Sequence, residues 1–464
     1  MNLFVLCYAN DNDAFVPELW VREGLAILEE NMVMANLVHR DFSMDIANYG
    51  DVVNTRRPGS FSAKRKVDAD SIVLQDATAT LVQVPLNQHI YISFTIKDGE
   101  ASKSFQDLVE VYLAPAMQGM ARSVDRILCG QVHQFLGNKA GKLGGLSSTT
   151  AKAYTLEARE KLNTNLAYQS GRNLVLAPSA ETALLATDLF IAANQRGDMG
   201  TALEEARLGR ILGFDTYMAQ NQPAALGVVN TKTQADAKNS AMAAGTTGSL
   251  TVNVSAYEAV AGEFVVFDDN AQPTWATAVT ASTDTTAVTL NEALKYAVAA
   301  NDGITIYKHA DVNGAYAAGY AKAITIDHTS GYRPAVGQLL AFGANTTARQ
   351  TFTIIDSVAV NATQCTVLLD RPLVSALTDG QDCFPGPAGT YNLAFHRDAL
   401  AFVSRPLARP NVSMGARSAV ASYNDVAMRV TMQYDITTQG TIVTCDLLAG
   451  VALLDANLGC VLLG

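Results

Sequence analysis

The sequence predicts an α+β protein in which an all-β segment is inserted into a mixed domain, and three observations support this prediction. Apolar residues recur at helical spacing over residues 17–38 and 104–136, and they alternate at every second position over residues 82–96. Residues from about 223 to 389 are instead rich in Ala, Thr, Val, Gly and Asn and contain short apolar runs typical of strands. The earlier composition returns after Tyr391, so the β segment interrupts the surrounding domain.

Composition excludes several classes of protein. The chain has 464 residues, enough for two to four domains of about 150 residues each. Hydrophobic residues make up 49% and charged residues 17%, which is typical of neither a disordered tail nor a coiled coil. The net charge of −11 argues against a surface that wraps nucleic acid by neutralising phosphates. We find no signal-peptide pattern and no long apolar run, so we expect no membrane partner.

Residues for catalysis or metal binding are not recognisable in the sequence. The six cysteines are scattered without a CxxC pair, which fits reduced, buried thiols better than zinc or a disulfide framework. Phosphate-binding glycine loops, zinc-protease helices and nucleophile elbows are not found. The sequence therefore predicts that the protein is not an enzyme, with no cofactor and no catalytic, cofactor-binding or metal-binding residues.

The N-terminal part predicts a helix, a β excursion and a second, longer helix. A proline begins an amphipathic helix over residues 17–38. Residues 82–96, together with residues 52–53, predict a long two-stranded excursion around a basic segment. Residues 104–136 predict one helix of roughly 50 Å, since each residue adds ~1.5 Å, with a kink at Pro115.

Shorter elements follow the long helix and close the chain. The pattern predicts helices over 156–165, 179–195 and 201–208, the second with Ser179 as its N-cap, and strands over 173–177 and 211–219. Beyond the β segment it predicts a helix over 397–404, a strand over 428–435 that is exposed on one face, and a last strand pair over 441–447 and 451–454.

The β segment carries a weak internal repeat. Short phrases recur at nearly constant offsets, which predicts two copies of one small β unit. The matching pairs are 261–264 with 336–339, 288–290 with 367–369, and 302–303 with 379–380.

A cluster of basic residues surrounds Pro58 and Gly59. Its members are Arg56, Arg57, Lys64, Arg65 and Lys66. Three interpretations are open: a solvated hairpin tip, a small nucleic-acid patch, or a charged tip that docks on an acidic neighbouring subunit. The acidic remainder of the chain favours docking over nucleic-acid binding.

The order of these parts and several short phrases resemble the major capsid proteins of tailed bacteriophages, which share the Johnson fold. The resemblance is closest to the coat proteins of short-tailed phages that carry an insertion domain. The phrases are LAILEENMV at 25–33 with VHRD at 38–41, LAPA at 113–116 with ARSVD at 121–125, GRILGFDTYMAQ at 209–220, FTI at 352–354, NLAFHRDA at 392–399 with SRPL at 404–407, and MRV at 428–430 with YD at 434–435.

The resemblance implies a division of the chain into five parts. Residues 1–48 would form an N-terminal arm and 49–100 an extended β loop. Residues 101–222 would form the spine helix, the peripheral domain and the start of the axial domain. The all-β segment 223–389 would be the inserted domain, and 390–464 would return to the axial and peripheral domains. The doubled β unit is more than we expect of the family.

The function implied by the resemblance is self-assembly into the icosahedral shell that encloses a viral DNA genome. The partners would be the chain itself in hexamers and pentamers, a scaffolding protein, a portal protein, and packaged double-stranded DNA bound without sequence specificity. Assembly of a procapsid in the host cytoplasm would precede expansion, and the final location would be the virion. We recognise no fused scaffold ahead of the arm and expect a separate one.

Candidate inter-subunit residues follow from the implied self-assembly. An isolated two-stranded excursion is marginal in water, so residues 82–96 need a partner surface, which we expect to be another copy. Charge pairing is expected from the basic cluster and apolar docking from the arm. The candidates are Arg56, Arg57, Lys64, Arg65 and Lys66 in the cluster, and Trp20, Leu25 and Leu28 in the arm.

Other functions stay open at this stage. Part of the wider fold family forms covalent Lys–Asn cross-links, for which Lys64 or Lys66 could serve, although nothing in the sequence marks the acid or the Asn partner. A carbohydrate-binding or adhesion protein of a virion surface would explain the Thr- and Asn-rich β segment, and predicts glycan binding by residues 223–389. A surface hydrolase would need a convergent nucleophile and base.

Overall fold

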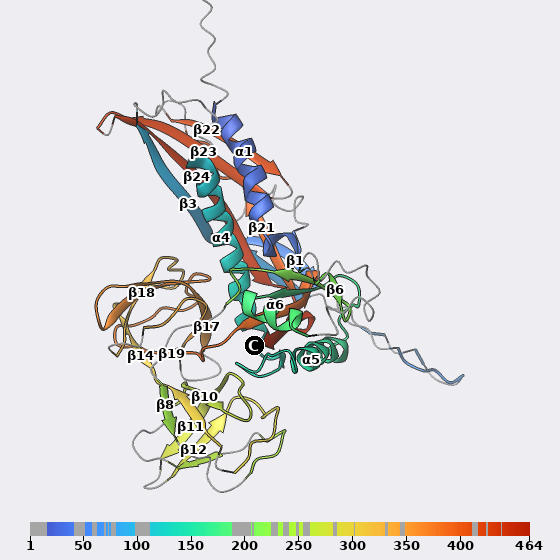
Figure 1. The fold of residues 1–464 in the computed structure, drawn as a ribbon. Helices are drawn as coiled ribbons and strands as arrows, with labels where there is room; N and C mark the ends of the chain where they lie inside the picture. The colour runs from blue at the N-terminus through green and yellow to red at the C-terminus, as the bar shows by residue number, and fades with distance from the viewer. Residues whose placement is uncertain are drawn as a thin grey trace, which may run out of the picture. The chain divides into compact units, whose positions relative to one another are not determined.

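A computed structural model describes most of the chain (Figure 1). The described residues are 16–40, 52–57, 63–68, 71–72, 74–75, 80–97, 112–187, 206, 208–223, 231–234, 241–246, 250–253, 260–281, 285–300, 302–329, 333–343, 349–410, 416–423, 426–437 and 439–464. No helix in these ranges is long and apolar enough to cross a membrane.

The chain folds into two compact units, which we name by their content. The sheet–helix unit comprises Met1–Met32, Arg40–Val124 and Ala401–Leu454. The β-rich unit comprises Val33–His39, Asp125–Leu400 and Asp455–Gly464. Both units are mixtures of helix and strand, so the chain is an α+β protein dominated by strands.

A five-stranded sheet forms the centre of the sheet–helix unit. Its strands are β21 (Leu400–Arg405), β24 (Gly440–Leu453), β23 (Val426–Asp435) and β22 (Arg417–Tyr423) in that order, with β3 (Gln88–Lys97) also paired to β24. The β3–β24 ladder is antiparallel and ten residues long, from Gln88 opposite Ala449 to Lys97 opposite Gly440. Helix α1 (Val16–Asn31) packs on β22 and β23 (Figure 1).

The core of this unit joins α1, β3 and the first part of helix α4 (Ala114–Gly130). The Trp20 ring stacks on Phe94, with 6.1 Å between ring centroids. A Cβ added at Gly24 would lie 2.9 Å from Met428 Cε and 3.2 Å from Met117 Sδ. The glycine therefore lets α1 approach both the sheet and α4, and these apolar groups are covered within one chain.

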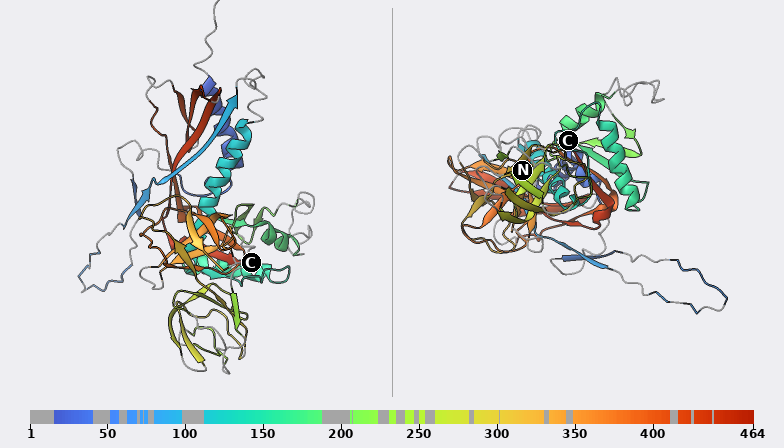
Figure 2. Two further views of the ribbon diagram at one scale, coloured as in Figure 1. Left: turned by 90° about the vertical axis from the view of Figure 1, so that its left-hand side faces the viewer. Right: turned by 90° about the horizontal axis from the view of Figure 1, so that it is seen from below.

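The long alternating segment is two strands rather than one. Strand β2 (Thr80–Pro85) pairs antiparallel with β1 (Val52–Arg57) in a separate two-stranded sheet, seen as a narrow ribbon in Figure 2. Strand β3 then joins the main sheet. Pro85 has no backbone N–H to donate to a ladder, which fits the change of partner at this point. The predicted two-stranded excursion is confirmed, but the prediction of one strand over residues 82–96 is wrong.

The predicted long helix is helical throughout residues 112–135, the part of it that the structure describes, but it changes type along its length. Residues 112–113 form a π turn, α4 ends at Gly130, and a 3₁₀ helix, η4 (Gln131–Phe135), follows. Pro115 is the second residue of α4, directly after the π turn. The predicted helical residues 104–111 lie outside the described ranges.

A mixed sheet forms the α/β part of the β-rich unit. Its strand order is β4 (Lys139–Ala140), β25 (Gly459–Leu463), β20 (Tyr391–His396), β5 (Arg172–Leu176), β7 (Phe214–Met218) and β6 (Arg210–Ile211). Helix α5 (Ala151–Thr164) and helix α6 (Pro178–Leu185) contribute to its core through Ala158, Leu162, Ala180 and Leu184. The predicted helix 156–165 and strand 173–177 are thus confirmed with shifted ends.

Several local predictions in this region are wrong. Ala177 caps α6 and Pro178 is its first residue, so Ser179 is not the N-cap, and residues 188–200 lie outside the described ranges. Ala206 has φ 54°, which excludes a continuous helix over 201–208. The predicted helix 397–404 is a 3₁₀ turn, η5 (Arg397–Ala399), followed by the buried strand β21. The predicted final strand pair is one strand, β24, and β25 was not predicted.

Residues 223–389 contain two β modules with the same strand order. The first module is a sheet of β8 (Thr231–Gln234), β13 (Ile304–Tyr307), β10 (Phe264–Phe267), β11 (Thr274–Ala281), β12 (Thr285–Leu290) and β9 (Leu250–Asn253). The second, which we call the barrel, closes as β14 (Ala310–Asn313), β19 (Asp382–Pro385), β16 (Leu339–Phe342), β17 (Gln350–Ala359), β18 (Gln364–Leu369) and β15 (Ile324–Asp327).

The two modules also match in their irregular features. A register shift lies between Ala276 and Ala278 in β11, and another lies between Ile354 and Asp356 in β17. In the described residues each module contains an isolated bridge, Met242 with Val298 and Tyr316 with Leu377. Gly262 and Gly337 both have positive φ, 105° and 83°, and each donates its N–H to the neighbouring long strand, to the Ala276 carbonyl of β11 and the Ile354 carbonyl of β17. These matches are what the predicted pair of similar β units would give.

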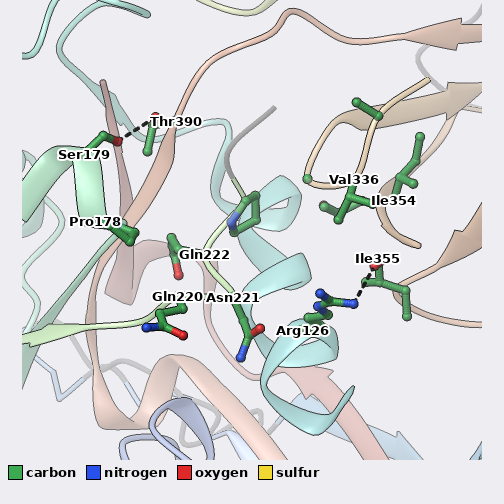
Figure 3. A pocket seen from close by; sticks show the side chains of 14 residues that line it. Arg126, Pro178, Ser179, Gln220, Asn221, Gln222, Val336, Ile354, Ile355 and Thr390 are labelled. Carbon is green, nitrogen blue, oxygen red and sulfur yellow. Dashed lines mark hydrogen bonds between the residues drawn. The ribbon is translucent and has the colours of Figure 1, made fainter. Parts of the chain in front are cut away.

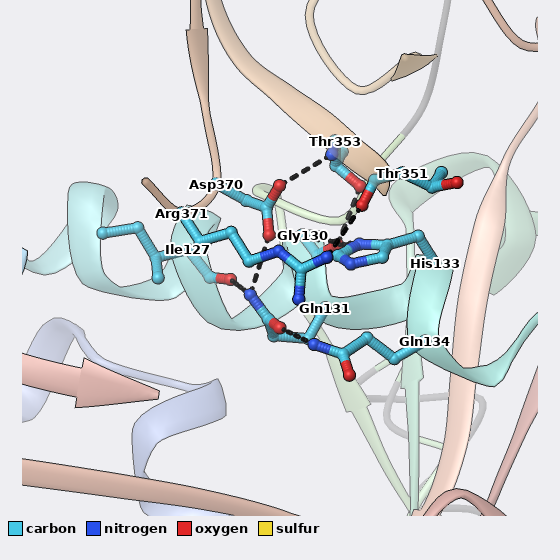
Figure 4. Close-up of polar contacts among 9 residues, drawn as sticks. All are labelled: Ile127, Gly130, Gln131, His133, Gln134, Thr351, Thr353, Asp370 and Arg371. Atoms are coloured by element: carbon cyan, nitrogen blue, oxygen red, sulfur yellow. Dashed lines mark hydrogen bonds and ion pairs between the residues drawn. The ribbon is translucent and has the colours of Figure 1, made fainter. Parts of the chain in front are cut away.

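Buried polar contacts join the barrel to the end of α4 (Figure 4). The Asp370 carboxylate accepts hydrogen bonds from Thr353 N at 2.8 Å and from Gln131 Nε2 at 2.8 Å. The Thr353 hydroxyl donates to the Gly130 carbonyl at 2.7 Å. A Cβ at Gly130 would lie 2.7 Å from Asp370 Cβ, so the glycine permits this approach.

Candidate subunit interface

The segment between β1 and β2 exposes apolar side chains. Val53 and Val84 at the base of the two strands are buried with Ala401 and Val403. Farther along the segment the exposed fractions are 70% for Val67, 77% for Ile72 and 89% for Leu74. The segment, which we call the β1–β2 loop, is therefore held at its base by its own chain and uncovered along the part described beyond it.

Basic side chains lie beside these apolar ones. Lys64, Arg65 and Lys66 directly precede Val67, and all three are exposed. In the described ranges none of the three takes part in an ion pair. Arg56 and Arg57 end β1 opposite Leu81 and Thr80, and their side chains lie outside what is described. The loop thus brings three predicted cations together with a row of exposed apolar residues.

The arm residues predicted for docking are covered by their own chain. Trp20 is 2% exposed, Leu25 4% and Leu28 0%. Trp20 stacks on Phe94, which in turn stacks on Tyr112 at 5.8 Å. In this conformation the three side chains belong to the core of the sheet–helix unit, so a second copy is not needed to explain them.

The apolar face of β3 is also covered within the chain. Ile92 Cδ1 lies 3.3 Å from where a Cβ of Gly119 in α4 would be, and Phe94 meets Trp20. The expectation that the whole of residues 82–96 seeks a partner surface is therefore wrong for the β3 part. Among the described residues of this region, the β1–β2 loop is the part whose apolar side chains stay exposed.

Sequence reasoning missed the most exposed apolar residues of this loop. Ile72 and Leu74 are two positions apart and so could share one face of an extended chain, but none of the described residues beside them, 71 and 75, lies in a regular strand. Their one sequence signal is that they follow the cationic run within a segment otherwise rich in Asp, Ala and Ser.

Comparisons with known proteins find solved structures with a similar fold but no protein related in sequence. No protein-family model matches the chain, and no curated protein matches it. A chain of Mycobacterium phage Che8 is 12% identical with a TM-score of 0.43, covering 93% of this chain and 90% of its own. The capsid structure of Cyanophage P-SCSP1u is 10% identical with a TM-score of 0.41, covering 89% of this chain and 84% of its own.

A third solved structure, the mature capsid of bacteriophage PhiM1, is 10% identical with a TM-score of 0.38. It covers 89% of this chain and 81% of its own. All three come from phages, and two are named as capsids, the family that the sequence resembles. Because each TM-score is below 0.5, we base the functional proposal on the residues of this chain.

Proposed function

We propose that this chain is a major capsid protein of a tailed bacteriophage and that its role is structural rather than catalytic. It would assemble in the host cytoplasm into the icosahedral shell of the virion. The observation that carries the proposal is the β1–β2 loop, whose exposed Val67, Ile72 and Leu74 adjoin three exposed cations on a unit that already has its own core. Large apolar side chains exposed close together in the sequence are candidates for an interaction site.

The chemistry of the loop favours a second copy as its partner. A two-stranded ribbon is marginal in water on its own, and covering its apolar side chains on another subunit would stabilise it. The chain carries a net charge of −11, so the surface of another copy offers acidic groups for Lys64, Arg65 and Lys66. We propose the same pairing with acidic groups for Arg56 and Arg57, because both lie in β1 of the same two-stranded sheet.

A loop that docks on a different surface of the next copy makes a heterologous contact. Such contacts close into rings when the rotation between copies is a simple fraction of a turn, and rings of six and five tile a closed shell. Hexamers and pentamers are therefore the assemblies we propose. Trp20, Leu25 and Leu28 act in this proposal by fixing α1 on its own sheet rather than by docking.

The other parts keep the roles that the resemblance suggests. We propose residues 1–48 as the arm, 49–100 as the extended loop, 101–222 and 390–464 as spine, peripheral and axial parts, and 223–389 as an insertion. A separate scaffolding protein and a portal would take part in assembly. Packaged DNA would meet the shell without sequence specificity, consistent with an acidic chain whose positive charge is local.

Assembly tests the proposal. The full chain is expressed alone and with a candidate scaffolding protein, and each product is examined by sedimentation velocity and negative-stain electron microscopy. We expect closed shells, tubes or sheets of regular capsomers in at least one of the two preparations. A monodisperse monomer in both would contradict the proposal.

A further inference from the structure

A cavity lined by three arginines lies in the α/β part of the β-rich unit. Its volume is about 300 Å³, at the small end of ligand sites, so it suits a small ion or one group of a larger ligand. The lining residues are Arg159, Gln169, Ser170, Arg172, Arg210 and Gly213. None of these six is acidic, although acidic residues outnumber basic ones in the chain. We call it the arginine cavity.

Three separate elements supply the arginines. Arg159 comes from α5, Arg172 begins β5, and Arg210 begins β6. Arg159 Nη1 donates to the Leu212 carbonyl in the β6–β7 turn at 2.7 Å. A Cβ at Gly213 would lie 3.4 Å from the same Nη1, so the turn backbone approaches the Arg159 guanidinium closely. The fold itself therefore brings the three charges to one cavity.

The Arg172 charge is buried without a carboxylate. The residue is 3% exposed, and its guanidinium donates to neutral oxygens of Ala167, Tyr168 and Asn163 at 2.6 to 2.8 Å. In the described ranges it takes part in no ion pair. Burial and then the neighbouring Arg159 charge lower the pKa of Arg172. A buried cation in these surroundings would be stabilised by a nearby anion.

Arg159 and Arg210 have guanidinium donors left for a ligand. Arg159 is partly buried, and among the described residues it makes the one hydrogen bond to Leu212 and no ion pair. The Arg210 side chain is 64% exposed, and its Nε lies 3.8 Å from the Asp215 carboxylate, too far for a hydrogen bond. Exposed Ser170 adds a hydroxyl to the same lining.

We propose that the arginine cavity binds a dianionic phosphate group. Guanidinium groups bind carboxylates and phosphates through parallel N–H···O hydrogen bonds. A carboxylate carries one negative charge, whereas a phosphate monoester carries about two and has three acceptor oxygens. Two charges match Arg159 and Arg172, which both lack a carboxylate, and the additional oxygen can accept from Arg210 or Ser170. The proposal does not depend on the shell function.

Competition for inorganic phosphate on the full chain tests the proposal. Line broadening in ³¹P NMR measures phosphate binding at constant ionic strength and about pH 8, where phosphate is dianionic. The competitors are methyl phosphate, a dianion, and two monoanions, dimethyl phosphate and acetate. We expect phosphate to bind at least about tenfold more tightly than either monoanion. Methyl phosphate distinguishes the sources, because displacement shows that a phosphate monoester fits, and no displacement restricts the ligand to free phosphate.

Two arginine variants test the residues. Arg159→Gln should weaken phosphate binding at least about tenfold, because a charge-assisted hydrogen bond is lost. Arg210→Gln should weaken it by about twofold to fivefold, because the Arg210 side chain is largely exposed. This second variant changes a surface residue, so it keeps the proposal testable if Arg159→Gln does not fold. Unfolding midpoints check that each variant folds.

Arg126→Gln is the matched control. Arg126 is a partly buried arginine that lines a separate cavity, formed by the start of α6 and the barrel, with no lining residue in common (Figure 3). Its replacement should leave phosphate binding unchanged. The proposal would be overturned by no phosphate binding, by a monoanion that binds as tightly as phosphate, or by unchanged binding in both Arg159→Gln and Arg210→Gln. An equal loss in Arg126→Gln would also overturn it.

Discussion

The β1–β2 loop and the barrel are both β structure, but they differ in what covers their apolar side chains. The barrel closes on itself, so each of its six strands has two neighbours, and a single cluster containing Phe342, Phe352 and Ile354 fills its interior. The β1–β2 sheet has two strands, and Val67, Ile72 and Leu74 beyond it face solvent. The barrel is complete within one chain, whereas we propose that the loop is covered by a partner.

This difference suggests that the barrel contributes to the stability of the chain and the loop to its assembly. The barrel's attachments lie inside its own unit, through Asp370 and Thr353 to the end of α4. The first module is tied to the α/β part of the same unit by the ion pairs of Lys139 with Glu292 and Lys295 with Glu157. Changes in the barrel should therefore alter the stability of the chain, and changes in the loop should alter assembly.

The largest expected effect is the loss of a barrel core side chain. Phe352 is fully buried, with its ring 5.9 Å from that of Phe342. Phe352→Ala should lower the free energy of unfolding by about 3–5 kcal/mol, because it removes buried apolar area and leaves a cavity. Urea unfolding of the full chain followed by circular dichroism measures this. Val360→Ala, on the barrel surface, is the control and should change it by less than about 0.5 kcal/mol. A loss below about 1 kcal/mol for Phe352→Ala would contradict a self-contained barrel.

The next effect is a pH dependence at the barrel's buried attachment. Burial raises the pKa of the Asp370 carboxyl to about 7, although the Arg371 charge and hydrogen bonds from Thr353 and Gln131 act to lower it. The protonated Asp370 carboxyl therefore contributes its full stabilisation below about pH 4, the pKa of an Asp in the unfolded chain. This contribution, at most about 4 kcal/mol, is lost as the pH rises through 7. The facing His133 stays neutral, since burial and then Arg371 lower its pKa to about 3.

Asp370→Asn keeps the shape of the side chain and removes this titration. The free energy of unfolding of the natural chain relative to that of the variant should fall as the pH rises from about 4 to about 8. Urea unfolding at a series of pH values checks the sign. A difference that is constant, or that grows with pH, would show that Asp370 is ionised in the folded protein well below neutrality.

The loop's apolar side chains should matter for assembly and not for folding. Replacing Val67, Ile72 and Leu74 by Ser should leave the unfolding free energy of the free chain nearly unchanged, because these groups face solvent. Assembly should weaken by about 1.5–3 kcal/mol for each side chain that a neighbour fully buries. Sedimentation velocity gives the concentration at which assembly begins.

A matched surface triple on the barrel provides the control for the loop variant. Val358, Val360 and Val374 are also exposed, and their replacement by Ser should leave assembly unaltered. Equal effects of the two triples on assembly would remove the distinction between loop and barrel.

The smallest effect is that of the loop cations. Surface ion pairs contribute about 0.2–1 kcal/mol each, so replacing Lys64, Arg65 and Lys66 by Gln should weaken assembly modestly. Raising the ionic strength from about 0.15 M to about 1 M shortens the screening length from about 8 to about 3 Å, which should loosen natural assemblies but scarcely those of the triple variant. Lys152→Gln with Lys322→Gln, two exposed lysines elsewhere, should retain the natural salt dependence.

Sequence patterns predicted strands with one polar face better than strands that are buried on both faces. The alternation over 88–97 is visible because residues such as Ser93 and Thr95 face away from α1 and α4, whereas β21 and β25 are buried on both faces and lose that alternation. The repeat was found because equivalent positions keep a nearly constant offset, from Phe264 to Leu339 and from Leu290 to Leu369.

The candidate interface was predictable in part. Charge alone located the loop cations, since Lys64, Arg65 and Lys66 are adjacent. The period of α1 reveals an apolar face but not whether its own chain or another covers it, so Trp20, Leu25 and Leu28 could not be assigned from sequence. The cavity with Arg159, Arg172 and Arg210 joins residues far apart in the chain and left no local pattern.

Accessibility of the loop in free and assembled protein tests the central claim most directly. The described native cysteines are buried, so Leu74→Cys in a Cys7→Ser background offers one exposed thiol for maleimide labelling, with Val360→Cys on the barrel as the comparison. We predict that assembly slows labelling of Leu74→Cys at least about tenfold, equivalent to about 1.4 kcal/mol of protection, and leaves Val360→Cys unchanged. Equal labelling of Leu74→Cys in both states, or a chain that never assembles, would contradict the account.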